Sequence, residues 1–335
     1  MPISRPLVRF ALRCALFGLP LATLGGWLER GLSTMENTYL AKREQLESRA
    51  STLVSIVTGS SGVFDGVDPD RLGVPAYNLA NGNQTLHYDI EIVSRYLDKM
   101  PRLQLVILGQ CYWSLGLDLR STREAWRRHF YSVFWRVPVE EPERQMVTIQ
   151  EHSYIALYTP VTAAQATLNG FHLPGSRRFL DNGWNPPEEP SAAQHAEGMS
   201  SSWTRLRVEG QKSEMRPESQ RRNVESLRAF SERLRLRGVS LALVWIPVST
   251  EYTAWFGEEV VAAQRSLHQE MATRPNVHFF DYSSDPRFTN DDFANGDHLG
   301  PSGARKFSDL LAAEVVGPML KRSAEPSVGT PPDRR

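Results

Sequence analysis

Cysteine is scarce in this chain of 335 residues, which contains only Cys14 and Cys111. Two cysteines, one of them in an apolar amino-terminal run, provide neither a disulfide framework nor a cysteine-based zinc site. Net charge is absent as well, because 38 basic residues balance 38 acidic ones. Proteins that bind nucleic acids usually carry a basic excess that displaces counterions, so this balance argues against a nucleic-acid partner.

The remaining composition is that of a globular protein, with 41% hydrophobic, 23% charged and 10% aromatic residues. A chain of this length can bury one large core or two modest ones. Composition therefore excludes the disordered and fibrous classes, and the function has to be sought in local patterns.

The amino-terminal segment has the pattern of a membrane-targeting sequence. Three arginines precede an uncharged stretch at residues 14–28. We expect residues 1–30 to form either an uncleaved membrane anchor or a signal peptide, and the lack of a clear small-residue cleavage site favours the anchor. The positive-inside rule then leaves the amino terminus in the cytoplasm and the rest of the chain in the periplasm or outside the cell.

Short apolar segments alternate with helical ones through most of the remaining chain. A linking helix is expected at residues 31–50, which are rich in helix formers. Strands are predicted at residues 52–58, 76–80, 103–108, 239–246 and 277–282. Helices are predicted at residues 87–99, 223–237, 258–272 and 302–320. This alternation predicts a doubly wound, flavodoxin-like α/β fold, in which helices cover both faces of a mainly parallel five-stranded sheet.

Residues 119–216 interrupt this alternation within an α/β domain expected at 51–322. They contain an aromatic and basic helix at 126–135 followed by a turn-rich stretch, and they are predicted to form an insertion of the kind that often makes a lid. The segment 205–237 has ten basic and five acidic residues and is interpreted as a solvated helical face. Residues 323–335 are predicted to be a disordered tail.

The first predicted strand ends in the sequence Gly-Ser-Ser-Gly at residues 59–62. Open parallel sheets bind ligands beyond the carboxyl ends of their strands, so residues that directly follow a strand are candidate site residues. A serine in a glycine-flanked turn at that position has the exposure that a nucleophile requires. Ser-Gly sequences are also ordinary turn chemistry, so this block alone does not define a site.

A histidine follows the last predicted strand in an acidic loop. Between Asp281 and His298 there are five aspartates and one arginine, and this negative charge favours imidazolium when His298 accepts a proton. A metal site is disfavoured because no second histidine lies nearby and the acidic spacing is not that of a calcium loop. The glycines after the first strand do not fit a dinucleotide-binding motif. We therefore expect neither a metal nor another cofactor.

Together, the Gly-Ser-Ser block and the sequence Asp-His-Leu-Gly-Pro-Ser-Gly-Ala at 297–304 resemble the SGNH/GDSL hydrolase family. The resemblance is to the membrane-anchored bacterial envelope branch, whose first block begins with these residues. It covers residues 50–118 and 217–320 and leaves the insertion unmatched. The resemblance implies that Ser61 is the nucleophile and that His298 is its base.

The same resemblance assigns the oxyanion donors. Residues 66–69 and 76–82 are similar to the second family block, whose glycine donates a backbone N–H to the oxyanion, and this role falls to Gly82. The third block usually contains Gly-x-Asn, whereas this chain has Gly-Gln-Cys at 109–111. The side-chain amide of Gln110 is the expected substitute donor.

The residue that should orient His298 departs from the family pattern. The family has an aspartate three residues before the histidine, and this chain has Asn295 there. An amide does not stabilise imidazolium, and the analogous change in a Ser-His-Asp triad costs on the order of 10⁴ in turnover. Asp297 and Asp292 are the substitutes in the same loop, although adjacent side chains such as 297 and 298 usually point apart. A Ser-His dyad, a rewired triad and a degenerate enzyme all stay open.

The function that the resemblance implies is that of an extracytoplasmic serine esterase or O-acyltransferase. Its expected substrates are ester-linked acyl groups of envelope glycans or lipids, and its expected partners are the membrane and proteins that modify envelope polysaccharides. The alternative hypothesis is a binding or accessory protein that keeps the fold without the chemistry. The sequence does not distinguish hydrolysis from acyl transfer.

Overall fold

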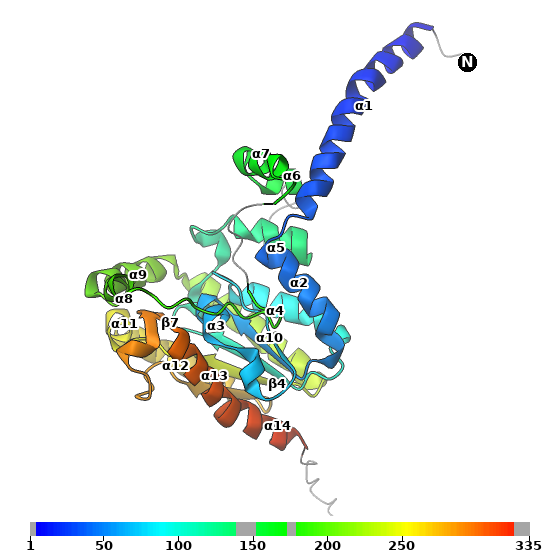
Figure 1. Ribbon diagram of the computed structural model, residues 1–335. Coiled ribbons are helices and arrows are strands. Elements are labelled where there is room, and N and C mark those ends of the chain that lie inside the picture. Colours follow the sequence, from blue (N-terminus) through cyan, green and yellow to red (C-terminus); the bar gives the residue numbers. More distant parts are fainter. Residues whose placement is uncertain (1–4, 139–151, 173–178, 325–335) are drawn as a thin grey trace, which may run out of the picture. The chain divides into compact units, whose positions relative to one another are not determined.

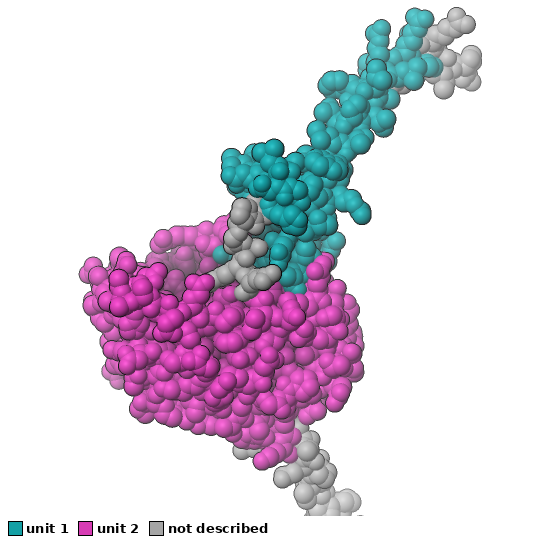
Figure 2. Space-filling model, viewed as in Figure 1, with its two compact units in different colours: residues 1–41, 127–177 teal, residues 42–126, 178–335 magenta. Residues whose placement is uncertain are grey.

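A computed structural model describes residues 5–138, 152–172 and 179–324 of the chain (Figure 1). The chain divides into two compact units, which Figure 2 colours separately. The first comprises residues 1–41 and 127–177, and the second comprises residues 42–126 and 178–335. The parallel sheet and every predicted site residue belong to the second unit.

The first unit is built around a long amino-terminal helix. Its helices are α1 (Arg5–Ser33), α5 (Arg127–Trp135), α6 (Tyr154–Leu157) and α7 (Pro160–Leu168). Within α1, the stretch Pro6–Ser33 has a mean hydropathy of 1.6 and is long and apolar enough to cross a membrane. The carboxylate of Glu29 near its end accepts the backbone N–H groups of Tyr154 and Ile155, at 2.6 and 3.0 Å, and so caps the first turn of α6.

The second unit contains the predicted five-stranded sheet, in which every strand pair is parallel. The spatial order is β2-β1-β3-β4-β5. The strands are β1 (Ser55–Gly59), β2 (Ala76–Asn78), β3 (Leu105–Gln110), β4 (Ser240–Trp245) and β5 (Val277–Asp281). The first three strands are buried throughout, as expected for a sheet covered on both faces. The predicted doubly wound α/β fold is therefore confirmed.

Helices surround this sheet and contact one another in pairs, such as α3 with α13 and α4 with α10. Those assigned wholly to the second unit are α3 (Ser61–Gly66), α4 (Leu86–Tyr96), α8 (Ala192–Gly198), α9 (Ser201–Glu214), α10 (Pro217–Leu236), α11 (Thr250–Phe256), α12 (Glu258–Met271), α13 (Pro301–Leu311) and α14 (Gly317–Ala324). Helix α2 (Thr38–Arg49) begins in the first unit and continues into the second. A π-helical turn, Ala312–Val316, joins α13 to α14.

Short 3₁₀ turns complete the second unit, at Ala50–Thr52, Pro69–Leu72, Leu97–Lys99, Ser114–Gly116, Leu119–Ser121 and Asn290–Asp292. The sequence did not predict a small antiparallel hairpin made of β6 (Phe293–Asn295) and β7 (His298–Leu299). In this hairpin Asn295 lies opposite His298, so a two-residue turn separates them.

The predicted insertion at 119–216 differs from the structure, because its parts belong to both units. Residues 127–177 belong to the first unit, whereas helices α8 and α9 belong to the second, where α9 packs against α11. The solvated face predicted at 205–237 also differs, since α9 and α10 are separate helices with buried residues of their own. Most of the predicted tail, residues 325–335, lies outside the described residues.

Candidate active site

The turn between β1 and α3 places Ser61 at the carboxyl end of the sheet. Gly59 has a φ of 146°, and a Cβ built on it would lie 2.5 Å from the carbonyl oxygen of Gly109, so no side chain fits there. Ser60 is the N-cap of α3 and Ser61 is its first residue. The sharp turn therefore presents the Ser61 hydroxyl above the sheet edge, as the sequence predicted.

A buried polar network fixes the helix that carries Ser61. The side-chain amide of Asn78, at the end of β2, donates to the carbonyl oxygens of Val63 and Val67 at 2.9 and 2.8 Å. The ammonium of Lys42 in turn donates to the backbone carbonyls of Asn78 and Gly183, both at 2.7 Å. Burial holds the pKa of Lys42 well below its usual range, although the charge of Asp65 opposes this shift.

His298 meets Ser61 at hydrogen-bond distance. The Nε2 atom of the imidazole lies 2.8 Å from the Ser61 Oγ atom. This is the separation at which a general base removes a proton from a nucleophile. The two residues are 237 positions apart in the sequence, so the fold brings them together.

Two side chains contact the other nitrogen of the imidazole. The Nδ1 atom of His298 lies 3.0 Å from the Asp297 Oδ1 atom and 3.1 Å from the Asn295 Oδ1 atom. The adjacent side chains of 297 and 298 meet because Asp297 lies in the turn of the β6–β7 hairpin and not in an extended strand, where they would point apart. Asn295, three residues before His298, adds a second acceptor beside the carboxylate.

Asp297 is itself held by two residues of α9 that the sequence did not identify. Its Oδ2 atom accepts hydrogen bonds from Arg207 Nε and Gln211 Nε2, each at 3.0 Å. The hydroxyl of Tyr252 donates to Gln211 Oε1 at 2.5 Å. Arg207 and Gln211 are four residues apart, so one face of the helix carries both. No motif marked them, and their role follows only from the way α9 packs.

The electrostatics of the pair suit a base held by a carboxylate. Burial alone would raise the pKa of Asp297, yet the charges of His298 and Arg207 outweigh it and hold that pKa well below its usual range. Burial would lower the pKa of His298, but the charge and hydrogen bond of Asp297 outweigh it, and the pKa is raised. Asp297 therefore stays ionised and stabilises the imidazolium that forms when His298 accepts a proton.

The backbone N–H groups of Ser61 and Gly82 are the candidate donors to an oxyanion, and that of Gly82 was predicted from the sequence. The N–H of Ser61, at the start of α3, donates to no acceptor within the described residues. The N–H of Gly82 donates to the side chain of Asn81 at 2.9 Å, so it would have to exchange that acceptor for an oxyanion. A Cβ built on Gly82 would meet nothing within 4 Å, which leaves room for a ligand beside it.

The predicted oxyanion role of Gln110 does not agree with the structure. Successive side chains of a strand point to opposite faces, and Gly109 faces Val63 of α3, so Gln110 points to the other side of the sheet. There its Oε1 atom lies 2.6 Å from Nε2 of His268 in α12. Cys111 is the next residue, and the pKa of its thiol is raised to about 12, mainly by burial and also by the charge of Asp297.

Asp292 was the other candidate for orienting His298, and the structure directs it elsewhere. Its Oδ2 atom contacts Lys306 Nζ at 2.5 Å and accepts the backbone N–H of Thr289 at 2.9 Å. Asp292 thus fixes the 3₁₀ turn before β6, and Asp297 is the carboxylate that reaches the imidazole. Among the described residues, no group of three or more His, Cys, Asp or Glu side chains could hold a metal ion.

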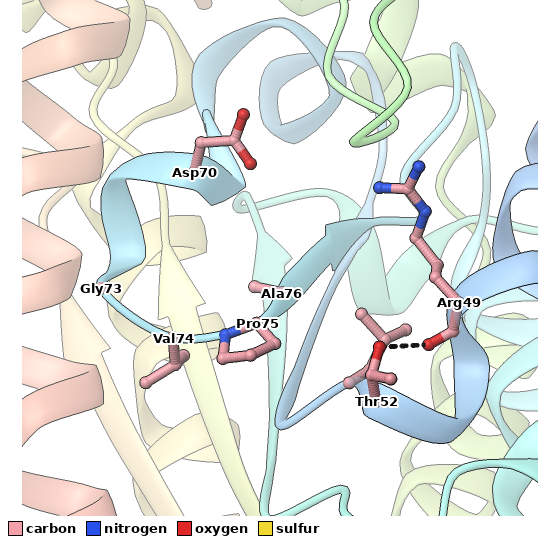
Figure 3. A pocket seen from close by; sticks show the side chains of 8 residues that line it. Arg49, Thr52, Asp70, Gly73, Val74, Pro75 and Ala76 are labelled. Atoms are coloured by element: carbon pink, nitrogen blue, oxygen red, sulfur yellow. Dashed lines mark hydrogen bonds between the residues drawn. The ribbon is translucent and has the colours of Figure 1, made fainter.

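A separate hollow of about 420 Å³ lies at the opposite end of the strands (Figure 3). Arg49, Thr52, Asp70 and the start of β2 line it, and the Thr52 hydroxyl donates to the Arg49 carbonyl at 2.8 Å. Parallel sheets bind ligands at the carboxyl ends of their strands, and this hollow is at the amino end of β2. It takes no part in the site around Ser61.

Comparisons with known proteins add little to this geometry. No protein-family model and no curated protein matches the chain. One solved structure, "The structure of a putative platelet activating factor from Streptococcus pneumonia", is similar over 88% of this chain and 98% of that chain. The identity is 10% and the TM-score is 0.39. A likeness this distant implies nothing about the reaction, which has to be inferred from the site itself.

Proposed function

We propose that the protein is a serine esterase or O-acyltransferase of the SGNH/GDSL type that uses a Ser61-His298-Asp297 triad. The observation that carries the proposal is the continuous chain of contacts from the Ser61 hydroxyl through both imidazole nitrogens to a buried, ionised carboxylate. A serine, a base and a group that orients the base are the parts of an activated nucleophile. Asp297 replaces the aspartate that the family places three residues before the histidine.

The reaction follows from this geometry. His298 Nε2 removes the Ser61 proton as Oγ attacks an ester carbonyl, and the N–H groups of Ser61 and Gly82 stabilise the oxyanion. The imidazolium, paired with Asp297, then protonates the departing alkoxide, and an acyl-enzyme forms on Ser61. Water completes a hydrolysis, whereas a second hydroxyl group completes an acyl transfer.

The proposed location is the cell envelope, with α1 as a membrane anchor and the second unit outside the cytoplasm. The apolar character of Pro6–Ser33 and the arginines at its start support this topology. Ester-linked acyl groups of envelope glycans or lipids are the substrates that such a location makes available.

The test is turnover of p-nitrophenyl acetate by the full chain in detergent micelles. Ser61→Ala should abolish release of p-nitrophenol above background, because it removes the proposed nucleophile. The matched control is Ser60→Ala, since the Ser60 side chain makes no capping hydrogen bond to α3. Equal turnover by wild type and Ser61→Ala, or no turnover by the folded wild type, would refute the proposal.

A further inference from the structure

A cleft of about 470 Å³ adjoins the proposed triad. Arg207 and Gln211 line it, and the same two side chains hold Asp297. Asn83 also lines it, and it directly follows Gly82, the expected oxyanion donor. The cleft therefore borders both the residues that support the base and the loop that would bind the oxyanion.

The walls of the cleft combine aromatic rings with hydrogen-bonding groups. Of its thirteen lining residues, the large apolar ones are Trp113, Leu117, Trp203 and Leu206. The others include amide, hydroxyl, carboxylate and guanidinium groups. A sugar ring has C–H faces that pack on indole rings and hydroxyl edges that these polar groups can bind. A long acyl chain would leave these polar groups without hydrogen-bond partners, which is unfavourable.

The cleft carries no excess of positive charge. Its lining contains two arginines, 123 and 207, and two glutamates, 124 and 214. Arg207 is already paired with Asp297, and the Glu214 carboxylate accepts the backbone N–H of Arg123 at 3.3 Å. A polyanionic glycan or a phosphate would require an excess of positive charge. The lining therefore favours an uncharged ligand.

We infer that this cleft binds a neutral sugar unit of the ester substrate or of the acyl acceptor. The link to catalysis rests on the proposed function, whereas the binding itself does not. Helix α9 then has two tasks, because one face holds Asp297 and the same helix supplies Trp203 to the sugar subsite.

The experiment is saturation-transfer NMR on the full chain in micelles of a detergent without a sugar headgroup. The probes are methyl glycosides and disaccharides of glucose, galactose, mannose and N-acetylglucosamine, with the matching uronic acids as charged counterparts. We expect at least one neutral probe to bind in preference to its uronate. Trp203→Ala should weaken that binding about tenfold or abolish it. Trp255→Ala is the control, because Trp255 is an exposed tryptophan outside the cleft.

The inference is overturned if no neutral probe binds, if the uronates bind better, or if Trp203→Ala binds as well as Trp255→Ala. Ser61→Ala separates it from the proposed function, because the sugar should still bind to that variant. If sugars bind but wild type turns over no ester, the proposed function fails and the binding site stands. If esters are turned over but no neutral sugar binds, only the inference about the cleft fails.

Discussion

The nucleophile turn, residues 59–66, and the acid-base hairpin, residues 293–299, contribute the two halves of the proposed site in different ways. Local rules govern the nucleophile turn, since a glycine with positive φ and a helix start position Ser61. The hairpin depends on distant residues, because Arg207 and Gln211 hold Asp297 from 90 and 86 positions away. The comparison indicates that local sequence sets the turn that carries Ser61, which Asn78 and Lys42 then anchor, whereas the carboxylate partner depends on tertiary packing throughout.

Among changes to the acid-base hairpin and its support, the largest loss of turnover should come from removing the Asp297 carboxylate. Asp297→Asn should lower ester turnover on the order of 10⁴-fold, because an amide neither stabilises the imidazolium nor selects the required tautomer. Steady-state kinetics with p-nitrophenyl acetate measures this loss. Asp292→Asn is the matched control and should retain activity within about twofold, since Asp292 is bound to Lys306. Similar losses of turnover in Asp297→Asn and Asp292→Asn would mean that both changes disturb the fold of the hairpin. The loss could then not be assigned to the contact of Asp297 with His298.

A smaller loss of turnover should follow when one of the hydrogen bonds to Asp297 is removed. Arg207→Gln removes one of the two hydrogen bonds to Oδ2 and should lower turnover about 10- to 100-fold, the range typical of residues that orient a functional ligand. Arg205→Gln on the same helix serves as the control, because Arg205 is exposed and contacts Glu209 and the ring of Trp255 rather than Asp297. Unchanged turnover in Arg207→Gln would show that α9 does not position the carboxylate.

The acid limb of the pH–rate profile should shift in opposite directions in Asp297→Asn and Arg207→Gln. The wild-type rate should fall as the pH drops through the raised pKa of His298, which lies above the usual 6.5, because only neutral imidazole accepts the proton. Asp297→Asn removes the main influence that raises this pKa and should move the acid limb of kcat/KM to lower pH. Arg207→Gln removes a charge that lowers it and should move the limb to higher pH. Shifts of the same sign in both variants would contradict this electrostatic account.

The smallest effect should come from Asn295. Its Oδ1 atom contributes a second, neutral contact to His298 Nδ1, so Asn295→Ala should reduce turnover only about threefold. Asp297→Asn in the same assay gives the scale for comparison. A loss as large as that of Asp297→Asn would mean that Asn295 orients His298 as strongly as Asp297 does.

Most of the sheet and one half of the site could be predicted from the sequence, because short-range patterns determine them. The strands near residues 56, 106 and 243 follow from apolar runs, and Ser61 and His298 follow from their position after a strand and in an acidic loop. The pairing of Asp297 with His298 depends on a hairpin with a two-residue turn, which the pattern of apolar residues did not predict. Arg207 was not predicted, because it lies in a segment interpreted as a solvated face. Its partner Asp297 is 90 residues away in the sequence.

The surroundings of Gln110 were also not predicted from the sequence. Its amide was expected at the oxyanion because the block around it resembles a family motif. The alternation of side chains along β3 instead directs it to His268, and Cys111 occupies the motif position. A shift of one residue along a strand moves a side chain to the opposite face of the sheet, and composition carries no information about that shift.

The most direct test of the account is to find the residue that a fluorophosphonate modifies. The full chain in detergent is labelled, digested and analysed by mass spectrometry, beside Ser61→Ala and a known serine esterase as a positive control. We expect a single phosphonyl adduct on Ser61, formed more slowly in Asp297→Asn. An adduct on another residue, or no adduct on folded wild type while the control esterase is labelled, would contradict the claim that Ser61 is an activated nucleophile.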